Sequence, residues 1–523
     1  MQDTGTGHWC AVPERVLVMG RGNRVFIICE GFDLGSFSRS IKDLTLISEA
    51  AHAPCQFDLL DCHDQSLRAG GRLLIDAGDT LQLMRDDGEI LSQKGSGKGR
   101  FVQDLPDGPV RSALSGFPRL RALMSIGSGA IESFTFAGLD DLQKTQVRGR
   151  VMTLSSNDGQ VTIAVVQPMQ GYRHAFKTVC AALERVAIKE HGIAPVFQNL
   201  IPFAVPYQAK PKIRLEAEEP SIQVASDIIR SYLAVARQNE AGVIADTDTE
   251  FLHDYRVSLR RIRSVLSLFK GVFTPTQTAV LKQEFSDLMT PTGRVRDLDV
   301  WLLKKEQYFN LLPENLHAGM NVLFAQFAKE RLRLWSELFN RFRSAPYEKQ
   351  MNRLAAQFAD TGTLHPGPDA DRGAYDYARA LIWKRYGKLC KQARRITPKT
   401  PDEAIHDLRI DCKKLRYLME FFAPLFDSKA FKKIIKPLKK LQENLGLFND
   451  CSVQQDALLR FVADQSNTKG RVDAQLALAV GGLIAVLGQK QKAERACVIA
   501  SFQHFDSPSI QHLFHSLFHN PED

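Results

Sequence analysis

Two rows of basic side chains recur in the sequence at the spacing of one helix face. Each row begins with a histidine, and further cations follow after three, seven and ten residues. At 100° per residue, each row falls within an arc of about 80° on a helix. Arginine forks and lysine ammonium groups are good partners for phosphate oxygens. The sequence therefore predicts an anion site built from His253, Arg256, Arg260, Arg263, His406, Arg409, Lys413 and Arg416.

An ordinary solvated helix face is the alternative interpretation of such a row. Exposed faces usually mix charges of both signs, since like charges four residues apart repel. Arg256 with Arg260, and Arg409 with Lys413, are like-charged pairs at that separation. The arrangement also occurs twice, which favours an anion site over a solvated face.

Further cations extend the predicted site. Arg261 and Lys414 keep their charge at equivalent positions of the two rows, and the later lysines at 436, 439 and 440 add to the second row. Lys384, Lys388, Lys391 and Arg395 share one face of another predicted helix. No glycine-rich GxxxxGK[ST] loop is present. Side chains would therefore hold the anion, and we expect no catalytic residue, metal site or cofactor.

The helices that carry the two rows belong to an internal repeat. Residues 253–300 align with residues 406–453 at a constant offset of 153, without a gap, and ten positions are identical. Apolar residues such as Leu259 and Leu415 lie on the side opposite the cations. This pattern predicts a duplicated helical fold with pseudo-twofold symmetry.

The chain changes character near residue 200. Residues 1–200 are β-rich, residues 201–220 are a charged, proline-containing linker, and residues 221–510 show helical periodicity. The fold class is thus multi-domain, with an N-terminal α+β domain around a curved sheet or barrel followed by an all-α domain of eight or more helices. Expected strands are Val16–Met19, Val25–Cys29, Arg72–Asp76, Thr80–Met84, Val147–Leu154 and Val161–Val166, and expected N-terminal helices are Ser38–Ala51 and His174–Lys189.

Net charge separates the two parts as well. Residues 1–217 hold 24 basic and 23 acidic residues, whereas residues 218–523 hold 44 and 36. The excess of +8 in the second part points to a polyanionic partner. Nine cysteines without a CxxC pair indicate reduced thiols in a cytoplasmic protein. The apolar run Ala474–Leu487 is too short to span a membrane and predicts a buried bundle helix.

The helical part resembles the CHAD family. The segments that carry the likeness are 248–264, 293–300, 403–417 and 438–453. The resemblance implies two pseudo-symmetric four-helix bundles whose basic and histidine residues line a central groove or pore that binds inorganic polyphosphate. It implies binding roles for the two rows of cations together with Lys439 and Lys440. The segment 328–342, where another histidine of the family would be expected, has none.

The N-terminal part is similar to a degenerate CYTH domain, a triphosphate-tunnel barrel often fused to CHAD. The likeness lies in residues 59–95. An ExExK strand is absent, since residues 25–30 read VFIICE, and residues 81–84 read LQLM where paired arginines are expected. Residues 161–168 lack a carboxylate for a metal. Tunnel chemistry needs carboxylates for Mg²⁺ and cations for phosphates, so we expect no catalysis here.

Three functions therefore remain to be compared. The first is polyphosphate binding by the helical domain, with association to polyphosphate granules in the cytoplasm and no membrane contact. The second is a residual metal-dependent triphosphatase in the N-terminal domain. The third is nucleic-acid binding, which the positive charge permits but which usually requires aromatic residues for base stacking on the binding face.

Overall fold

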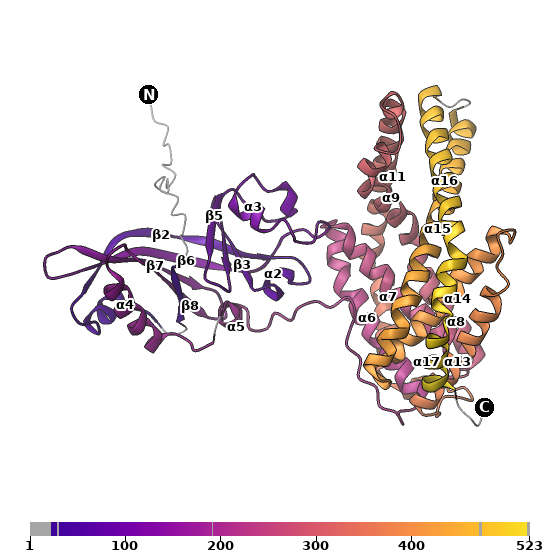
Figure 1. The fold of residues 1–523 in the computed structure, drawn as a ribbon, viewed down its shortest axis with the longest axis horizontal. Helices are drawn as coiled ribbons and strands as arrows, with labels where there is room; N and C mark the ends of the chain where they lie inside the picture. Colours follow the sequence, from indigo (N-terminus) through magenta and orange to yellow (C-terminus); the bar gives the residue numbers. More distant parts are fainter. Residues whose placement is uncertain (1–21, 29–30, 191, 470–472, 520–523) are drawn as a thin grey trace. The chain divides into compact units, whose positions relative to one another are not determined.

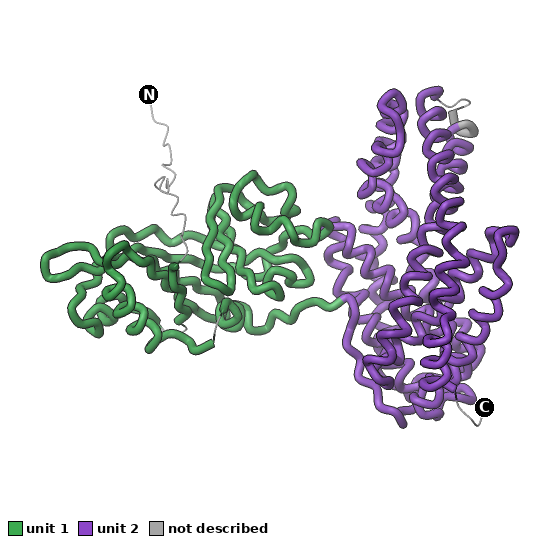
Figure 2. Tube along the Cα trace, in the orientation of Figure 1, with its two compact units in different colours: residues 1–208 green, residues 209–523 purple. Residues whose placement is uncertain are grey.

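The computed structural model describes residues 22–28, 31–190, 192–469 and 473–519 of the 523-residue chain. The chain divides into two compact units, residues 1–208 and 209–523, which are coloured separately in Figure 2. The division falls inside the predicted linker, and each unit is described by itself. Among the described residues, no helix is both long and apolar enough to cross a membrane.

The first unit is built around one antiparallel sheet of eight strands in the order β1-β8-β7-β6-β2-β3-β4-β5 (Figure 1). The strands are β1 (Arg24–Ile28), β2 (Thr45–Asp61), β3 (Arg72–Ala77), β4 (Thr80–Arg85), β5 (Ile90–Lys94), β6 (Met124–Leu139), β7 (Thr145–Ser155) and β8 (Gln160–Gln167). The helices of this unit are α1 (Leu34–Arg39), α2 (Ser66–Ala69), α3 (Pro109–Ala113), α4 (Arg173–Val186) and α5 (Ala194–Leu200), with the 3₁₀ turn η1 (Val102–Asp104).

Five of the predicted strands are confirmed as β1, β3, β4, β7 and β8, and the predicted helix near residues 174–189 is confirmed as α4. The predicted strand Val16–Met19 lies outside the described residues. The prediction of a helix over Ser38–Ala51 is wrong, because α1 ends at Arg39 and β2 begins at Thr45. Glu49, Ala50 and Ala51 suggest a helix locally, but β2 pairs with β6 along almost its whole length. This pairing between distant segments outweighs local helix propensity.

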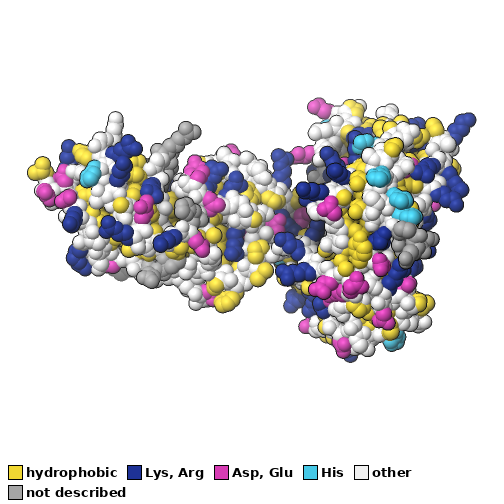
Figure 3. Space-filling model, turned by 60° about the horizontal axis from the view of Figure 1, so that its bottom comes forward, with side chains coloured by type: hydrophobic (Ala, Val, Ile, Leu, Met, Phe, Trp, Pro, Cys, Tyr) yellow, Lys and Arg dark blue, Asp and Glu magenta, His cyan; other side chains and the backbone are white. Residues whose placement is uncertain are grey.

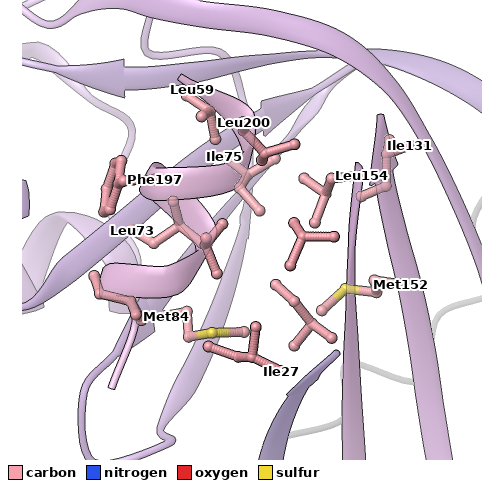
Figure 4. Packing of buried hydrophobic residues seen from close by; sticks show 14 of the residues in the cluster. Ile27, Leu59, Leu73, Ile75, Met84, Ile131, Met152, Leu154, Phe197 and Leu200 are labelled. Atoms are coloured by element: carbon pink, nitrogen blue, oxygen red, sulfur yellow. The ribbon is translucent and has the colours of Figure 1, made fainter. Parts of the chain in front are cut away.

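Alternation along the strands gives the sheet two apolar faces. Leu59, Ile75 and Leu154 point to one face, where α5 covers them (Figure 4). Neighbouring residues of the same strands point to the other face and pack against α4 or beside α2 and α3. The face covered by α5 therefore forms a hydrophobic core.

The second unit is all-helical. Its helices are α6 (Ser221–Ala245), α7 (Thr249–Leu268), α8 (Pro275–Met289), α9 (Gly293–Leu303), α10 (Lys305–Phe309), α11 (His317–Phe342), α12 (Ala345–Ala359), α13 (Ala374–Ala393), α14 (Asp402–Phe422), α15 (Ser428–Lys469), α16 (Ala474–Phe505) and α17 (Pro508–Phe518). Short 3₁₀ turns are η2 (Thr290–Thr292), η3 (Glu314–Leu316), η4 (Thr361–Thr363) and η5 (Ala423–Leu425). The helices continue past the expected boundary at residue 510, because α17 follows α16.

The duplication is visible in where the helices begin. The helices α6, α7 and α8 start at residues 221, 249 and 275, and α13, α14 and α15 start 153 residues later at 374, 402 and 428. The halves differ after that point. The first half breaks at Pro291 in η2, whereas α15 runs continuously through Pro437. The helical periodicity and the duplication predicted from sequence are both present in the structure.

Buried aromatic and aliphatic side chains hold the two halves together. Phe269, which follows α7, stacks on Phe422 at the end of α14, with ring centroids 4.9 Å apart and an interplanar angle of 12°. In α7, Asp248 caps the helix by accepting hydrogen bonds from the backbone N–H groups of Glu250 and Phe251. Capping and core packing thus fix the helix that carries the first row of cations.

Candidate anion-binding site

The two predicted rows of cations lie on α7 and α14, and these two helices contact each other. Arg260 of α7 is close enough to Arg409 and Lys413 of α14 for its charge to lower the pKa of both. Rows that are 153 residues apart in sequence therefore meet in one place. We call Arg256, Arg260, Arg409 and Lys413 the cationic cluster.

The pKa of Lys413 shows most clearly how burial and the neighbouring cations disfavour positive charge in the cluster. Burial, followed by the charges of Arg409 and Arg260, lowers the pKa of Lys413 to about 8, and Asp450 offsets this only in part. Burial also lowers the pKa of Arg409. Burial and like charge act in the same direction on Lys413, so this ammonium group is poorly stabilised in the free protein.

Carboxylates at the cluster do not balance its charge. Asp450 Oδ1 is 3.9 Å from Arg409 Nη2 and is itself largely exposed. Asp297 occupies the equivalent position in the first repeat and acts on Arg256. The four cations of the cluster thus carry more charge than Asp297 and Asp450 can balance, and a bound anion would neutralise the excess.

Arg256 also has a structural role. Its Nη1 donates hydrogen bonds to Met289 O at 3.2 Å and to Thr292 Oγ1 at 2.5 Å, which ties α7 to the break between α8 and α9. Arg263 Nη1 lies 3.4 Å from Met289 Sδ. Arg260, which is exposed, is therefore the residue of the α7 row that is most available to a ligand.

The two histidines lie at the starts of their rows. His406 is exposed, and its Nδ1 is 2.6 Å from Asn449 Oδ1 of α15. If Nδ1–H donates to this oxygen, Nε2 remains available as the second ring nitrogen. His253 is half-buried in α7. Sequence reasoning missed Asn449, because the equivalent residue of the first repeat is Arg296 and the alignment gives no signal there.

Two of the predicted site residues point elsewhere. Arg261 is only 5% exposed, its Nη2 is 2.5 Å from Glu420 Oε2, and its guanidinium packs over the rings of Tyr232 and Tyr417. Lys414 contacts Asp411 on a different side of α14, at 3.5 Å. The repeat conserves both charges, but the structure separates them from the cationic cluster because they lie about 100° from the row on the helix.

The remaining predicted cations lie at the edge of the cluster or on α15. Arg416 is half-buried, and its Nε is 3.2 Å from Glu420 Oε1. Lys436 and Lys439 lie on the same face of α15 as Asp450, within an arc of about 60°, and Lys440 lies at the edge of that face. All three lysines are exposed. The face of α15 that contacts Arg409 therefore continues as a row of ammonium groups.

A glycine recurs beside the cluster in both repeats. Gly446 lies on the same face of α15 as Asp450, and a Cβ added there would meet nothing within 4 Å. At the equivalent Gly293, the nearest atom to such a Cβ is Arg256 Nη1 at 3.7 Å. Glycine in a helix interior costs about 1 kcal/mol relative to alanine, which applies to Gly446 within α15, whereas Gly293 is the first residue of α9. These two positions therefore leave open backbone next to the cations.

Comparison with known proteins identifies part of the helical unit. A family model for the CHAD domain matches residues 227–459. These residues are a CHAD domain. The match includes α7, α14 and the first part of α15, and hence every residue of the cationic cluster.

Solved structures give further points of comparison. The CHAD domain from the plant Ricinus communis is 27% identical, with a TM-score of 0.46 over 60% of this chain and 97% of that one. PptA from Streptomyces chartreusis is 16% identical, with a TM-score of 0.44 over 55% of this chain and 100% of that one. A search of curated proteins gave no match. The sheet unit lies outside the region matched by the CHAD model, so its likeness to CYTH remains a prediction.

Proposed function

We propose that the CHAD domain binds inorganic polyphosphate through the cationic cluster. The observation that carries this proposal is the convergence of Arg260, Arg409 and Lys413 from two repeats, where burial and like charge lower the pKa of Lys413 to about 8. Such an arrangement is unfavourable in the free protein and becomes favourable once an anion is bound. The site thus has the properties of a phosphate site.

A polymer suits the arrangement better than a single phosphate. Each row extends over ten residues, or about 15 Å at a rise of about 1.5 Å per residue. The lysines of α15 prolong the positive surface beyond this length. A chain of regularly spaced phosphates can contact many of these groups at once and release its condensed counterions, by analogy with nucleic acids. Lys436, Lys439 and Lys440 belong to the proposed site on this ground.

The test is a titration of the full-length protein with long-chain polyphosphate at several salt concentrations. Because binding would release counterions, the logarithm of the affinity should fall linearly with the logarithm of salt concentration. Affinity that does not change between low and moderate salt would contradict the electrostatic mechanism. In cells, a fluorescent fusion should coincide with polyphosphate granules in the cytoplasm, and an even distribution would count against granule association.

Nucleic-acid binding is the second candidate for the same positive charge. The aromatic rings next to the cluster, including Tyr232, Tyr417 and Phe421, are buried around Arg261 and cannot stack on bases. Competition of RNA and DNA against polyphosphate separates the two functions. We expect polyphosphate to displace either nucleic acid at equal phosphate concentration.

Polyphosphate binding should depend on pH through Lys413. Because Lys413 has a pKa of about 8 in the free protein, part of its positive charge disappears between pH 7 and 9. A bound polyanion favours the protonated form and raises this pKa, so affinity should fall as pH rises through 8, and binding near pH 8 should take up a proton. Calorimetry in buffers of different ionisation enthalpy measures this uptake.

Lys413→Arg is the matched control for this pH effect, since arginine keeps its charge throughout the range. The variant should bind polyphosphate with weaker pH dependence and without the proton uptake. The free energy of unfolding should depend on pH in the opposite direction to the polyphosphate affinity. Between pH 8 and about 10.5, the unfolded chain holds more protons at this lysine than the folded one, so Lys413 makes the free energy of unfolding rise with pH.

We further propose that the sheet unit has no triphosphatase activity. The face covered by α5 carries Leu59, Ile75 and Leu154, and residues of this kind cannot hold Mg²⁺ or phosphate (Figure 4). Within the residues that the structure describes, no group of three or more His, Cys, Asp or Glu side chains is arranged to hold a metal. These features support a role other than tunnel chemistry.

The corresponding prediction is that the protein releases no phosphate from tripolyphosphate or nucleoside triphosphates above background, with Mg²⁺ or Mn²⁺ present. A malachite-green assay measures this release. Metal-dependent release that disappears when carboxylates of the sheet unit are replaced would establish the residual triphosphatase instead.

A further inference from the structure

A second group of cations lies on α13 and α14, away from the cationic cluster. Its centre is Asp411 of α14, which is 4% exposed. Three cations approach its carboxylate: Lys388 Nζ at 3.0 Å, Arg385 Nη1 at 3.4 Å and Lys414 Nζ at 3.5 Å. One buried carboxylate therefore orients three basic side chains and neutralises only one of them.

Neighbouring residues increase the excess of positive charge. Lys384 and Lys391 lie one turn before and one turn after Lys388 on α13. Both are exposed, and neither forms an ion pair within the described part of the chain. Asp407 and Glu403, one and two turns before Asp411, are further acids on this side of α14. The five cations of this group thus outnumber these three carboxylates. Figure 3 shows that Lys and Arg side chains gather in several groups on the helical unit.

The backbone between these lysines is open. Gly387 is exposed within α13, and a Cβ added there would meet nothing within 4 Å. A glycine in a helix interior has a cost of about 1 kcal/mol relative to alanine. Its effect here is that an anion can approach the helix backbone between Lys384, Lys388 and Lys391.

We propose that Lys384, Lys388, Lys391 and Lys414 form a second anion-binding surface, the α13 surface, for another segment of the same polyphosphate chain. This inference rests on the proposed function. Lys413 of the cationic cluster and Lys414 of the α13 surface are adjacent on α14, so the two sites flank one helix about 10 Å across. A long chain that leaves the cluster can cross α14 and reach the α13 surface, whereas tripolyphosphate is too short to occupy both.

The test compares long-chain polyphosphate with tripolyphosphate on four full-length proteins. These are the unmodified chain, Lys384→Ala with Lys391→Ala in the α13 surface, Arg260→Ala with Lys413→Ala in the cluster, and Lys329→Ala with Lys349→Ala as a control. The control removes the same charge from exposed lysines of α11 and α12. Thermal melting verifies that each variant is folded. This is expected for the α13 and control variants, because none of the four lysines replaced in them forms an ion pair within the described residues.

The α13 variant should bind long chains several-fold more weakly than the control variant. Its salt slope should decrease by about 0.7–0.9 for each phosphate that is no longer neutralised, on the nucleic-acid scale. Its affinity for tripolyphosphate should equal that of the unmodified chain. The cluster variant should bind both ligands more weakly.

Equal binding of long chains by the α13 and control variants would overturn the α13 surface and leave the proposed function intact. Absence of polyphosphate binding by the unmodified chain would instead overturn the proposed function. Weaker binding of tripolyphosphate by the α13 variant would show that its lysines belong to the same short-range site, which would also contradict a separate surface.

Discussion

Replacing Arg260 and Lys413 together by alanine should weaken polyphosphate binding by at least a hundredfold while leaving the CHAD domain folded. A hydrogen bond to a charged group contributes about 1.5–3 kcal/mol, so each cation removed corresponds to roughly tenfold or more in affinity. Both residues lie where the two repeats meet, and their mutual repulsion disappears in the variant. The melting temperature of the free protein should therefore stay the same or rise.

Paired changes within each repeat make this prediction more specific. If the repeats build one continuous site, Arg256→Ala with Arg260→Ala should weaken the same binding event as Arg409→Ala with Lys413→Ala, and to a similar extent. Arg256 also holds the break after α8, so some loss of stability is expected from the first pair alone. Should the Arg260 and Lys413 variant melt well below the unmodified chain, the cations would be structural and the anion site would be refuted.

Replacing Phe422 by alanine should lower the stability of the helical unit and leave its affinity for polyphosphate unchanged. Phe422 is fully buried and stacks on Phe269, which is 3% exposed. Truncating a buried phenylalanine costs about 3–5 kcal/mol, since the ring no longer packs against its apolar neighbours and a cavity remains. Urea denaturation of the full-length chain should show this destabilisation in the transition of the helical unit.

Polyphosphate binding provides the control for that prediction. Phe422 lies on the apolar side of α14, away from the row that holds Arg409 and Lys413. The folded fraction of the variant should therefore bind with the affinity of the unmodified chain. A variant with unchanged stability would mean that the stacking of the two phenylalanines does not support the junction of the repeats.

The sequence predicted the helical unit best, because the same 3.6-residue period indicates both the helices and the faces on which they pack. The rows on α7 and α14 follow a 3.6-residue period over two to three turns, and the repeat aligns them without a gap. Their meeting in space could be inferred from the duplication. The charge shared by Arg261 and Lys414 was misleading, because helical spacing already places both about 100° from the rows. The partners that hold Arg261, Glu420 and three rings contributed by other helices, could not be inferred from the sequence.

The sheet unit was harder to predict for a related reason. Strand β2 contains Glu49, Ala50 and Ala51, which favour a helix in isolation, and only its ladder with β6 keeps it extended. Conversely, residues 25–28 of β1, 81–84 of β4 and 161–167 of β8 carry no charged side chain, and this feature of the sequence agrees with the apolar face seen in the structure. The apolar character of individual strands was therefore predicted more reliably than the positions at which helices and strands begin and end.

The common offset of 153 residues has a consequence for the kind of polymer that fits. The two rows, one in each repeat, present nearly the same four groups to a ligand that enters from either end, although the lysines at 436, 439 and 440 have no basic equivalent in the first repeat. Inorganic polyphosphate has no direction, since its two ends are chemically equivalent, and it can enter such a site in either orientation with the same interactions. RNA and DNA run from a 5′ to a 3′ end and would meet the second row with reversed chemistry. A duplicated site therefore suits a polymer, such as the proposed ligand, whose two ends are chemically equivalent.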